Sequence, residues 1–418
     1  MTIGIFQFHG CDKCFAETTL LKEDPEADVL WVPDPASYDG TPTDAAVVCG
    51  YLLPSDKAVL DQISTNAGKI IAYGSCPASG GIFGLANQKG RDVVPIQTLV
   101  PEAINVDGCL AEVEELQAVI AGEIPNHAKQ LCPTCARRST CKFLDKVVRQ
   151  LDLADADKEA CFNDLGFMCM GYVANECKER CISAGTPCRG CKPKVDRPGI
   201  RMLGMFGTLM GNIEVATEGS KYGATDKLAD KNDDVTNALP DIVGNFFRFS
   251  LPVANLPKGR QPSNGSVMGD VLAGRLVEEL PLILGMAGGQ RFISLTLQVI
   301  EAYEQGAGIT PSEQVQAMRQ QLVQLEGELT QAVSARDPAQ YRAASTEIRK
   351  LAGNMNLSNI FYGGFKVPFD GAGEASDFDN YRAKPFEVKD GAYTSGPIQF
   401  TLDPTGIVTQ FTAEEVAE

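Results

Sequence analysis

The chain has 418 residues, among them 14 cysteines and 2 histidines, and a formal net charge of −17. With 44% hydrophobic and 22% charged residues it can form a folded core, which excludes global disorder. The acidic charge argues against a nucleic-acid binder, because phosphate neutralisation needs clustered Lys and Arg. There is no apolar run of membrane-spanning length, and the first residues lack the basic and apolar regions of an export signal. We therefore expect a cytoplasmic protein whose cysteines bind metal rather than form disulfides.

The first 110 residues alternate between short runs of β-forming residues and helical patterns such as Ser55–Asn66. This alternation predicts an α/β fold with a parallel, doubly wound sheet. The expected strands are Ile3–Phe8, Asp28–Val32, Ala45–Cys49 and Lys69–Tyr73. Ligands of such sheets collect at the carboxyl ends of the strands. Three cysteines follow strand ends and should converge there, and a fourth can join them from a later loop: Cys11, Cys14, Cys76 and Cys109.

The cysteines are unevenly distributed, since all precede residue 192 and nine fall between Cys132 and Cys191. Residues 131–191 show little periodicity and many Gly and Pro, so metal rather than an apolar core should supply their fold. Two CxxC pairs, at 132/135 and 188/191, have the spacing of zinc sites, and iron–sulfur clusters use the same thiolates. The spacing predicts several thiolate metal sites and leaves the metal open.

The last 160 residues have a different character. Thr310-Pro311 begins a helical pattern, and Asp337-Pro338 restarts one that ends at Gly353, which predicts a helical hairpin over 311–352. Alternating apolar residues on both sides of Asp403-Pro-Thr-Gly406 predict a β-hairpin over 398–411. We therefore expect an α+β segment at this end of the sequence.

Six motifs occur in a fixed order along the first 257 residues. They are Gly10-Cys11-Asp-Lys-Cys14, Tyr73-Gly-Ser-Cys76, Gly108-Cys109, Cys132-Pro-Thr-Cys135, the stretch from Cys161-Phe-Asn-Asp-Leu-Gly-Phe-Met-Cys169 to Cys188-Arg-Gly-Cys191, and Asn245-Phe-Phe-Arg-Phe-Ser-Leu-Pro252. Together they resemble the small subunits of nickel–iron hydrogenases, most closely the cytoplasmic, heterodisulfide-reductase-linked type, also called methyl-viologen-reducing. Nothing after about residue 260 is similar to that family.

The resemblance implies a domain order. Residues 1–125 would form a flavodoxin-like domain with a proximal 4Fe–4S cluster, and residues 126–200 a loop-rich domain with a medial and a distal cluster. Residues 201–260 would complete the small subunit, and residues 261–418 would be an α+β extension. The resemblance implies no flavin or nucleotide, because cysteines occupy the loops at the strand ends where a flavin would bind.

The resemblance also implies twelve cluster ligands in three sets of four, with iron as the metal and no catalytic residue in this chain. The proximal set is Cys11, Cys14, Cys76 and Cys109; the medial set is Cys177, Cys181, Cys188 and Cys191; the distal set is Cys132, Cys135, Cys161 and Cys169. Two cysteines remain. Cys49 is better explained as a small buried hydrophobe, and Cys141 is a possible substitute for a distal ligand.

The implied function is electron transfer within a hetero-oligomeric oxidoreductase, a soluble hydrogenase. The nickel–iron centre would lie in a separate large subunit, and a heterodisulfide-reductase-like, ferredoxin-like or flavoprotein subunit would exchange electrons at the other end. The family usually has Gly where Lys13 stands and Pro-Pro where Leu110-Ala111 stand, beside a pocket that faces the large subunit. These departures leave a second interpretation open, in which the partner subunit belongs to a redox complex without hydrogen chemistry.

Three polar residues near the cysteines need no special role. We expect His9 and His127 to make ordinary polar contacts, although His9 could tune the proximal cluster and His127 could be a ligand. Glu17 lies where an acid could relay protons, but a charge at a helix N-terminus is the simpler explanation.

Overall fold

The computed structural model describes most of the chain. The described residues are 1–125, 129–140, 159–193, 241–254, 265–355, 391–404 and 406–413, with the short pieces 256, 259, 357, 360–361 and 364–365. Cys141 and His127 lie outside them. Within these ranges no helix combines the length and the apolar character needed to cross a membrane.

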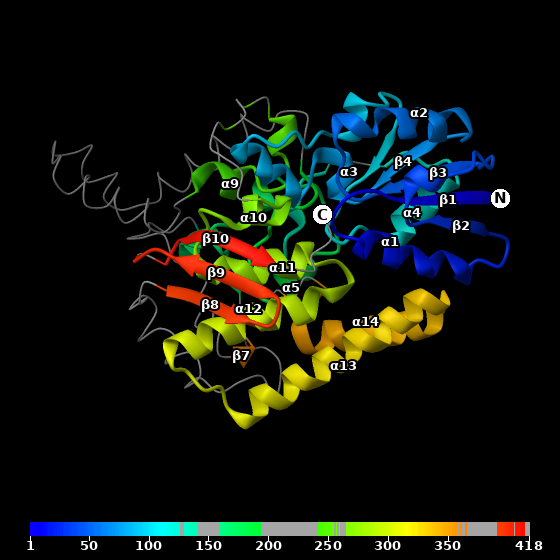
Figure 1. Ribbon diagram of the computed structural model, residues 1–418. Coiled ribbons are helices and arrows are strands. Elements are labelled where there is room, and N and C mark those ends of the chain that lie inside the picture. The colour runs from blue at the N-terminus through cyan, green and yellow to red at the C-terminus, as the bar shows by residue number, and fades with distance from the viewer. Residues whose placement is uncertain are drawn as a thin grey trace.

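Five parallel strands form a sheet in the order β2-β1-β3-β4-β5 (Figure 1). The strands are β1 (Thr2–Gln7), β2 (Asp28–Val32), β3 (Ala45–Cys49), β4 (Ile70–Tyr73) and β5 (Ile104–Val106). This is the flavodoxin-like order, with the topological switch point between β1 and β3. The prediction of a parallel α/β sheet is therefore confirmed, and the first four strands lie where the sequence placed them. The sequence did not reveal β5, which has only three residues.

Side chains alternate between the two faces of this sheet, as they must along extended strands. On one face Phe6, Val48 and Ala72 pack against Leu60 and Ile63 of the helix between β3 and β4. On the other face the strand residues belong to a larger apolar cluster. The helices of this part of the chain are α1 (Lys13–Glu17), α2 (Lys57–Thr65), α3 (Ser75–Ser79) and α4 (Val113–Ile120).

The cysteine-rich part is built of loops, as predicted. Its described residues contain one short α-helix, α5 (Arg180–Ser183), and several single turns of 3₁₀-helix. Isolated β-bridges such as Gln130–Asn175 and Ala174–Pro193 hold its loops together. Its own apolar cluster is small and centres on Leu131 and Phe162, so the cysteines are embedded in a region with little core of its own.

The predicted helical hairpin is confirmed by α13 (Glu313–Ala335) and α14 (Pro338–Ala352). The first of these helices begins two residues after the expected start, because the Ser312 side chain accepts a hydrogen bond from the Val315 amide and caps it. Shorter helices precede the hairpin: α9 (Ile242–Phe246), α10 (Val267–Leu272), α11 (Leu280–Ala287) and α12 (Phe292–Ala307).

The predicted β-hairpin is also confirmed and has a third strand. β9 (Ile398–Leu402) pairs antiparallel with β10 (Val408–Ala413) and with β8 (Gly391–Ser395). A separate two-stranded pair consists of β6 (Ile360–Phe361) and β7 (Gly364–Phe365). The described part of the segment after residue 260 is therefore α+β, as expected from the sequence.

The extension packs against the parallel sheet rather than standing apart from it. Ile5 and Val47 of the sheet share one continuous apolar cluster with Ile283, Phe292 and Tyr341 of the extension. In Figure 1, α13 and α14 run alongside α1, and Tyr341 of α14 donates a hydrogen bond to Glu17 at the end of α1. The sheet and the extension therefore fold around a common core.

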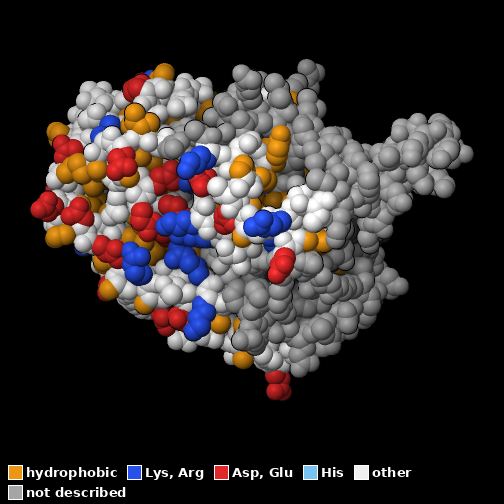
Figure 2. Space-filling view, turned by 180° about the vertical axis from the view of Figure 1, so that it is seen from behind, with side chains coloured by type: hydrophobic (Ala, Val, Ile, Leu, Met, Phe, Trp, Pro, Cys, Tyr) orange, Lys and Arg blue, Asp and Glu red, His pale blue; other side chains and the backbone are white. Residues whose placement is uncertain are grey.

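Charged side chains of both signs cover the face shown in Figure 2. Acidic side chains are scattered over one half of the described surface, and Lys and Arg side chains gather near its middle. Lys178 and Glu114 form an exposed ion pair. The charge of this face is therefore mixed, although the chain as a whole is acidic.

Replacing the cap of α14, Asp337→Ala, is expected to lower the free energy of unfolding by about 1 kcal/mol. The Asp337 carboxylate accepts hydrogen bonds from the amides of Ala339 and Gln340, and alanine leaves both amides without this partner. Urea denaturation followed by circular dichroism measures the change. Gln324→Ala, at an exposed position in α13, is the control and should change the midpoint little; equal shifts for both variants would contradict the capping role.

Candidate functional site

Four cysteines meet at the carboxyl edge of the parallel sheet. Cys11 and Cys14 follow β1, and Cys14 lies in α1, whereas Cys76 lies in α3 after β4 and Cys109 follows β5. Burial is the main cause of the raised pKa of Cys14, Cys76 and Cys109. Negative charge on Cys11 also raises these three pKa values, because the four cysteines lie close together. The structure therefore brings together the four residues predicted to bind the proximal cluster.

Glycines allow the backbone to approach these sulfurs. Gly74 has a φ of +101°, and a Cβ there would lie 2.7 Å from the Cys14 Sγ atom. Gly81 has a φ of +54°, and a Cβ there would lie 2.8 Å from the Cys76 Sγ atom. Both positions combine a backbone conformation that favours glycine with a space that excludes a side chain.

Burial makes these thiols weak acids. It raises the pKa of Cys14 to about 12, with the charge of Cys11 as the next cause, and it raises the pKa of Cys76 well above its ordinary value. Thiols of this kind stay protonated unless a cation stabilises the thiolate. The iron ions of a cluster supply that positive charge, because a thiol that coordinates a metal is deprotonated. The donor set thus fits an iron–sulfur cluster.

Four further cysteines line a single cavity. Cys177, Cys181, Cys188 and Cys191, the predicted medial set, surround it, and Cys109 of the proximal set reaches its wall. Backbone amides point at two of the sulfurs, with Glu179 N 3.3 Å from Cys177 Sγ and Gly190 N 3.4 Å from Cys188 Sγ. Hydrogen bonds to cluster sulfurs are one of the means by which proteins set reduction potentials.

The predicted distal set is more exposed. Cys132 is exposed and Cys135 and Cys161 are half-buried, whereas Cys169 is buried. Burial raises the pKa of Cys132 to about 11, with the charges on Cys161 and Cys135 as further causes. A Cβ on Gly171 would lie 3.2 Å from the Cys132 Sγ atom and 3.8 Å from the Cys169 Sγ atom, so these two sulfurs face a common space.

The three sets follow one another in space. The Cys109 amide hydrogen-bonds to Cys191 Sγ and so joins the proximal set to the medial set. Burial raises the pKa of Cys191, and this hydrogen bond lowers it by a smaller amount. The Cys188 amide donates to Cys169 Sγ at 3.3 Å, which joins the medial to the distal set. The cysteines are therefore arranged in a row, with the medial set in the middle.

A single metal ion and a 4Fe–4S cluster differ in what they require of their thiolate ligands. In the part of the chain that the structure describes, no three Cys, His, Asp or Glu side chains converge closely enough to share one ion. A zinc ion needs its sulfur ligands at about 2.3 Å from one point. A 4Fe–4S cluster makes a wider demand, because its four thiolates bind different iron atoms of the cluster.

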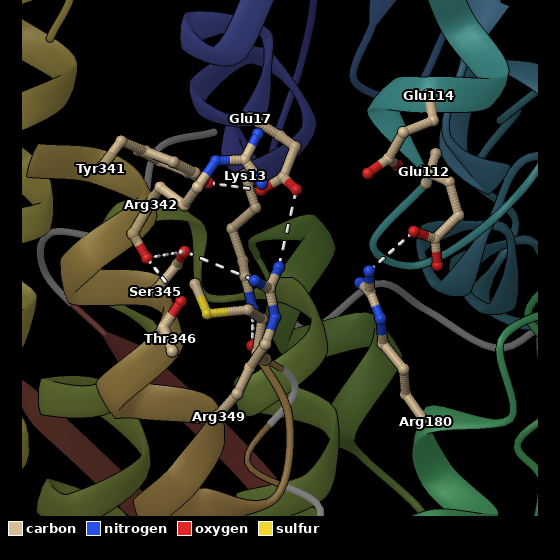
Figure 3. A network of polar contacts seen from close by, with 12 residues as sticks. Lys13, Glu17, Glu112, Glu114, Arg180, Tyr341, Arg342, Ser345, Thr346 and Arg349 are labelled. Atoms are coloured by element: carbon tan, nitrogen blue, oxygen red, sulfur yellow. Dashed lines mark hydrogen bonds and ion pairs between the residues drawn. The ribbon is translucent and has the colours of Figure 1, made fainter. Parts of the chain in front are cut away.

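Glu17, beside the proximal set, has a role that the sequence did not predict. It is the last residue of α1, and it stands directly before a 3₁₀-helix (Thr18–Glu23) whose N-terminal amides its side chain does not cap. The side chain is buried, at 3% exposure. Tyr341 Oη donates to its carboxylate at 2.6 Å, and Arg349 lies 3.5 Å from it (Figure 3). Only the position of Glu17 near the cysteines hinted at this contact.

Cys49 and His9 have the roles expected from the sequence. Cys49, at the end of β3, is fully buried in the apolar cluster. Burial is the main cause of its raised pKa, and negative charge on the nearby Cys14 raises it further. His9 makes an ordinary polar contact, with its Nε2 atom 3.0 Å from Asp56 Oδ1.

Comparison with known proteins adds family information. Residues 10–122 match the family described as NADH ubiquinone oxidoreductase, 20 Kd subunit, and this range contains all four proximal cysteines. The G subunit of the F420-non-reducing hydrogenase of Methanothermobacter marburgensis is 26% identical over 303 residues, which cover 61% of this chain and 96% of that protein. More than a third of this chain thus has no counterpart in that relative, a share similar to the extension after residue 260.

Other relatives agree. The iron–sulfur G subunit of the F420-non-reducing hydrogenase of Archaeoglobus profundus is 24% identical over 277 residues, 51% of this chain and 80% of that protein. Among solved structures, the [NiFeSe] hydrogenase of Desulfovibrio vulgaris Hildenborough aligns with 18% identity and a TM-score of 0.31 over 48% of this chain and 95% of that chain. The resemblance predicted from the motifs is confirmed by the sequence relatives: the chain is similar to the G subunits of F420-non-reducing hydrogenases.

Proposed function

We propose that the chain is an iron–sulfur electron-transfer subunit of a nickel–iron hydrogenase, with three 4Fe–4S clusters. The ligands would be Cys11, Cys14, Cys76 and Cys109 for the proximal cluster, Cys177, Cys181, Cys188 and Cys191 for the medial cluster, and Cys132, Cys135, Cys161 and Cys169 for the distal cluster. The observation that supports this function best is the row of three cysteine sets, joined by the contacts of Cys109 with Cys191 and of Cys188 with Cys169.

The residues of this chain would hold the clusters and tune them. Each cluster, when bound, takes up and releases one electron. The thiolates bind iron, and the amides of Glu179 and Gly190 donate to ligand sulfurs, which stabilises the more reduced, more negative state. None of the proximal or medial cysteines is fully exposed, which limits the access of water to them, whereas the exposed Cys132 leaves the distal set accessible to a partner.

The partners in this proposal are two further subunits. A large subunit would carry the nickel–iron centre and supply electrons from H2 at the proximal end, because the relatives are named as hydrogenase subunits. A heterodisulfide-reductase-like, ferredoxin-like or flavoprotein subunit would accept the electrons near the distal set.

A second candidate function is electron transfer in a complex without hydrogen chemistry. The observation in its favour is at the proximal set, where the sulfurs of Cys11 and Cys109 lie 3.6 and 3.7 Å from the carbonyl oxygen of Met286 in this chain's own extension. In this candidate the three clusters and their ligands are the same, and only the partner at the proximal end differs.

Protein purified without oxygen is expected to contain about twelve irons and twelve acid-labile sulfides per chain, because each of three clusters has four of each. Metal analysis and electron paramagnetic resonance of the reduced protein measure this. Zinc in place of iron would overturn both candidates. Nickel in the co-purified complex together with H2-dependent reduction of a viologen dye would support the hydrogenase; an iron–sulfur complex that lacks both would support the second candidate.

A further inference from the structure

The extension lies directly on the proximal cysteines. Met286, near the end of α11, is 3% exposed, and its carbonyl oxygen faces the sulfurs of both Cys11 and Cys109. Two of the four proximal ligands are thus in contact with a segment that follows them by more than 170 positions in the sequence. The cover over these two sulfurs is therefore formed by the chain's own residues.

Lys13, between Cys11 and Cys14, anchors the extension. Its side chain is buried at 5% exposure, and its Nζ atom donates hydrogen bonds to the carbonyl oxygens of Gly285, at 2.8 Å, and Met355. The ammonium also lies 3.7 Å from the centre of the Phe292 ring, a cation–π contact. A buried ammonium group is stable only where its hydrogen-bond donors have acceptors, so the buried position of the Lys13 side chain depends on the extension.

A second anchor stands next to it. The Asp12 carboxylate accepts one hydrogen bond from the Gln290 amide at 2.8 Å and another from the Gln290 side chain at 2.6 Å. A third polar contact, between Glu17 and Tyr341, joins the end of α1 to α14, and Figure 3 shows Lys13, Glu17 and Tyr341 close together. Three residues of the loop and helix that carry Cys11 and Cys14 therefore bind three separate parts of the extension.

Buried ion pairs attach the extension to residues 241–254 as well. Arg248 pairs with Glu279, and Arg275 Nη2 lies 2.7 Å from Asp241 Oδ2. Both arginines are almost fully buried, so these contacts belong to the core rather than to a loose surface contact. The extension is therefore attached both to the loop of the proximal cysteines and to residues 241–254.

We infer that the extension, residues 265–355, takes the place of a separate subunit on the proximal-cysteine face. This inference rests on the proposed function in one respect, namely that Cys11 and Cys109 hold a cluster. It places the large subunit of that proposal against the outer surface of the extension and not directly on these cysteines. A second protein could reach the sulfurs of Cys11 and Cys109 from the side of Met286 only by displacing α11. Lys13, between two of the proximal cysteines, contributes a side chain that binds the extension.

A cavity of about 470 Å³ remains between the two parts, lined by Cys11 and Asp12 on one side and by Gln290 and Arg291 on the other. This volume is in the range of small-ligand pockets. The inference therefore concerns protein partners, which would have to contact the outer surface of the extension.

Lys13→Met in the full-length protein tests the inference. Hydrogen–deuterium exchange is expected to be slow over residues 280–296 of the wild type and about tenfold faster there in the variant, since two buried carbonyls lose a charged donor. Lys57→Met is the matched control, because Lys57 is an exposed lysine of the same domain, and it should exchange like the wild type. Release of iron to a ferrous chelator should become faster for about a third of the iron, one cluster of three.

The outcomes of these measurements distinguish the inference about the extension from the proposed function. Rapid exchange of residues 280–296 in the wild type, or unchanged exchange in Lys13→Met, would overturn the inference about the extension. A wild-type protein without iron, but with residues 280–296 protected, would overturn the proposed function and support the covering role of the extension. Gln290→Ala, which changes only the extension, is expected to loosen the same segment and replaces Lys13→Met should that variant fail to fold.

Discussion

The Cys181→Ala variant is expected to lose one of the three proposed clusters, with about four fewer irons and four fewer sulfides per chain than the wild type. Cys181 lies in the middle of the row, on the wall of the cavity shared by the medial cysteines. Loss of the medial cluster would interrupt the relay, so reduction of the distal end by electrons that enter at the proximal end should fall below detection. Iron and sulfide analysis, with electron paramagnetic resonance of the reduced protein, measures the loss.

Cys49→Ala is the matched control for this variant. Cys49 is as deeply buried as any of the proposed ligands and lies near the proximal set, yet it belongs to the apolar cluster of the sheet. Its replacement should leave iron, sulfide and electron transfer unchanged and lower stability slightly through the small cavity that forms. Equal loss of iron from both variants would show that the twelve ligands are wrongly assigned.

The parallel sheet was largely predictable because its signal is local. Each of the first four strands is a short run of β-forming residues between Gly, Pro or Asp, and the cysteines that follow strand ends necessarily share one edge. β5 was missed because Ile104–Val106 is too short to show a pattern. The hairpin of α13 and α14 was found because each helix carries an apolar stripe and a recognisable cap.

The position of the extension was not predictable from the sequence. α11 is buried at every position, so it has no polar face and no helical periodicity that would reveal its neighbours. The contact of Lys13 with Met355 joins residues 342 positions apart, and no local pattern encodes such a pair. A lysine between two cysteines looks like a surface residue, and only the folded structure shows that its charge is buried.

The departures from the family near the proximal cysteines are explained by this packing. Lys13 binds carbonyl groups of the extension, and Ala111 is fully buried while Leu110 packs against the cluster that the sheet shares with the extension. The sequence showed both departures and indicated that the partner at this face was in question.

Arg275→Met is expected to lower the free energy of unfolding by about 3 kcal/mol or more, because breaking a buried ion pair leaves a charge without its partner. Arg275 is 1% exposed, its Nη2 atom lies 2.7 Å from Asp241 Oδ2, and its Nε atom donates to the Val271 carbonyl at 3.2 Å. The pair joins residues 241–254 to the extension. Urea unfolding followed by circular dichroism measures the change.

Arg342→Met is the control variant, because it removes an exposed ion pair between the extension and the first domain instead of a buried one. Arg342 also joins the extension to the first domain, through two hydrogen bonds to Glu23, but the two side chains are 51% and 40% exposed. Water screens such a pair, so its loss should change the free energy of unfolding by less than about 1 kcal/mol. If Arg275→Met lowered the free energy of unfolding as little as Arg342→Met, the extension would be held mainly by its apolar surface. The buried ion pairs would then fix its orientation over the proximal cysteines and would not strengthen its attachment.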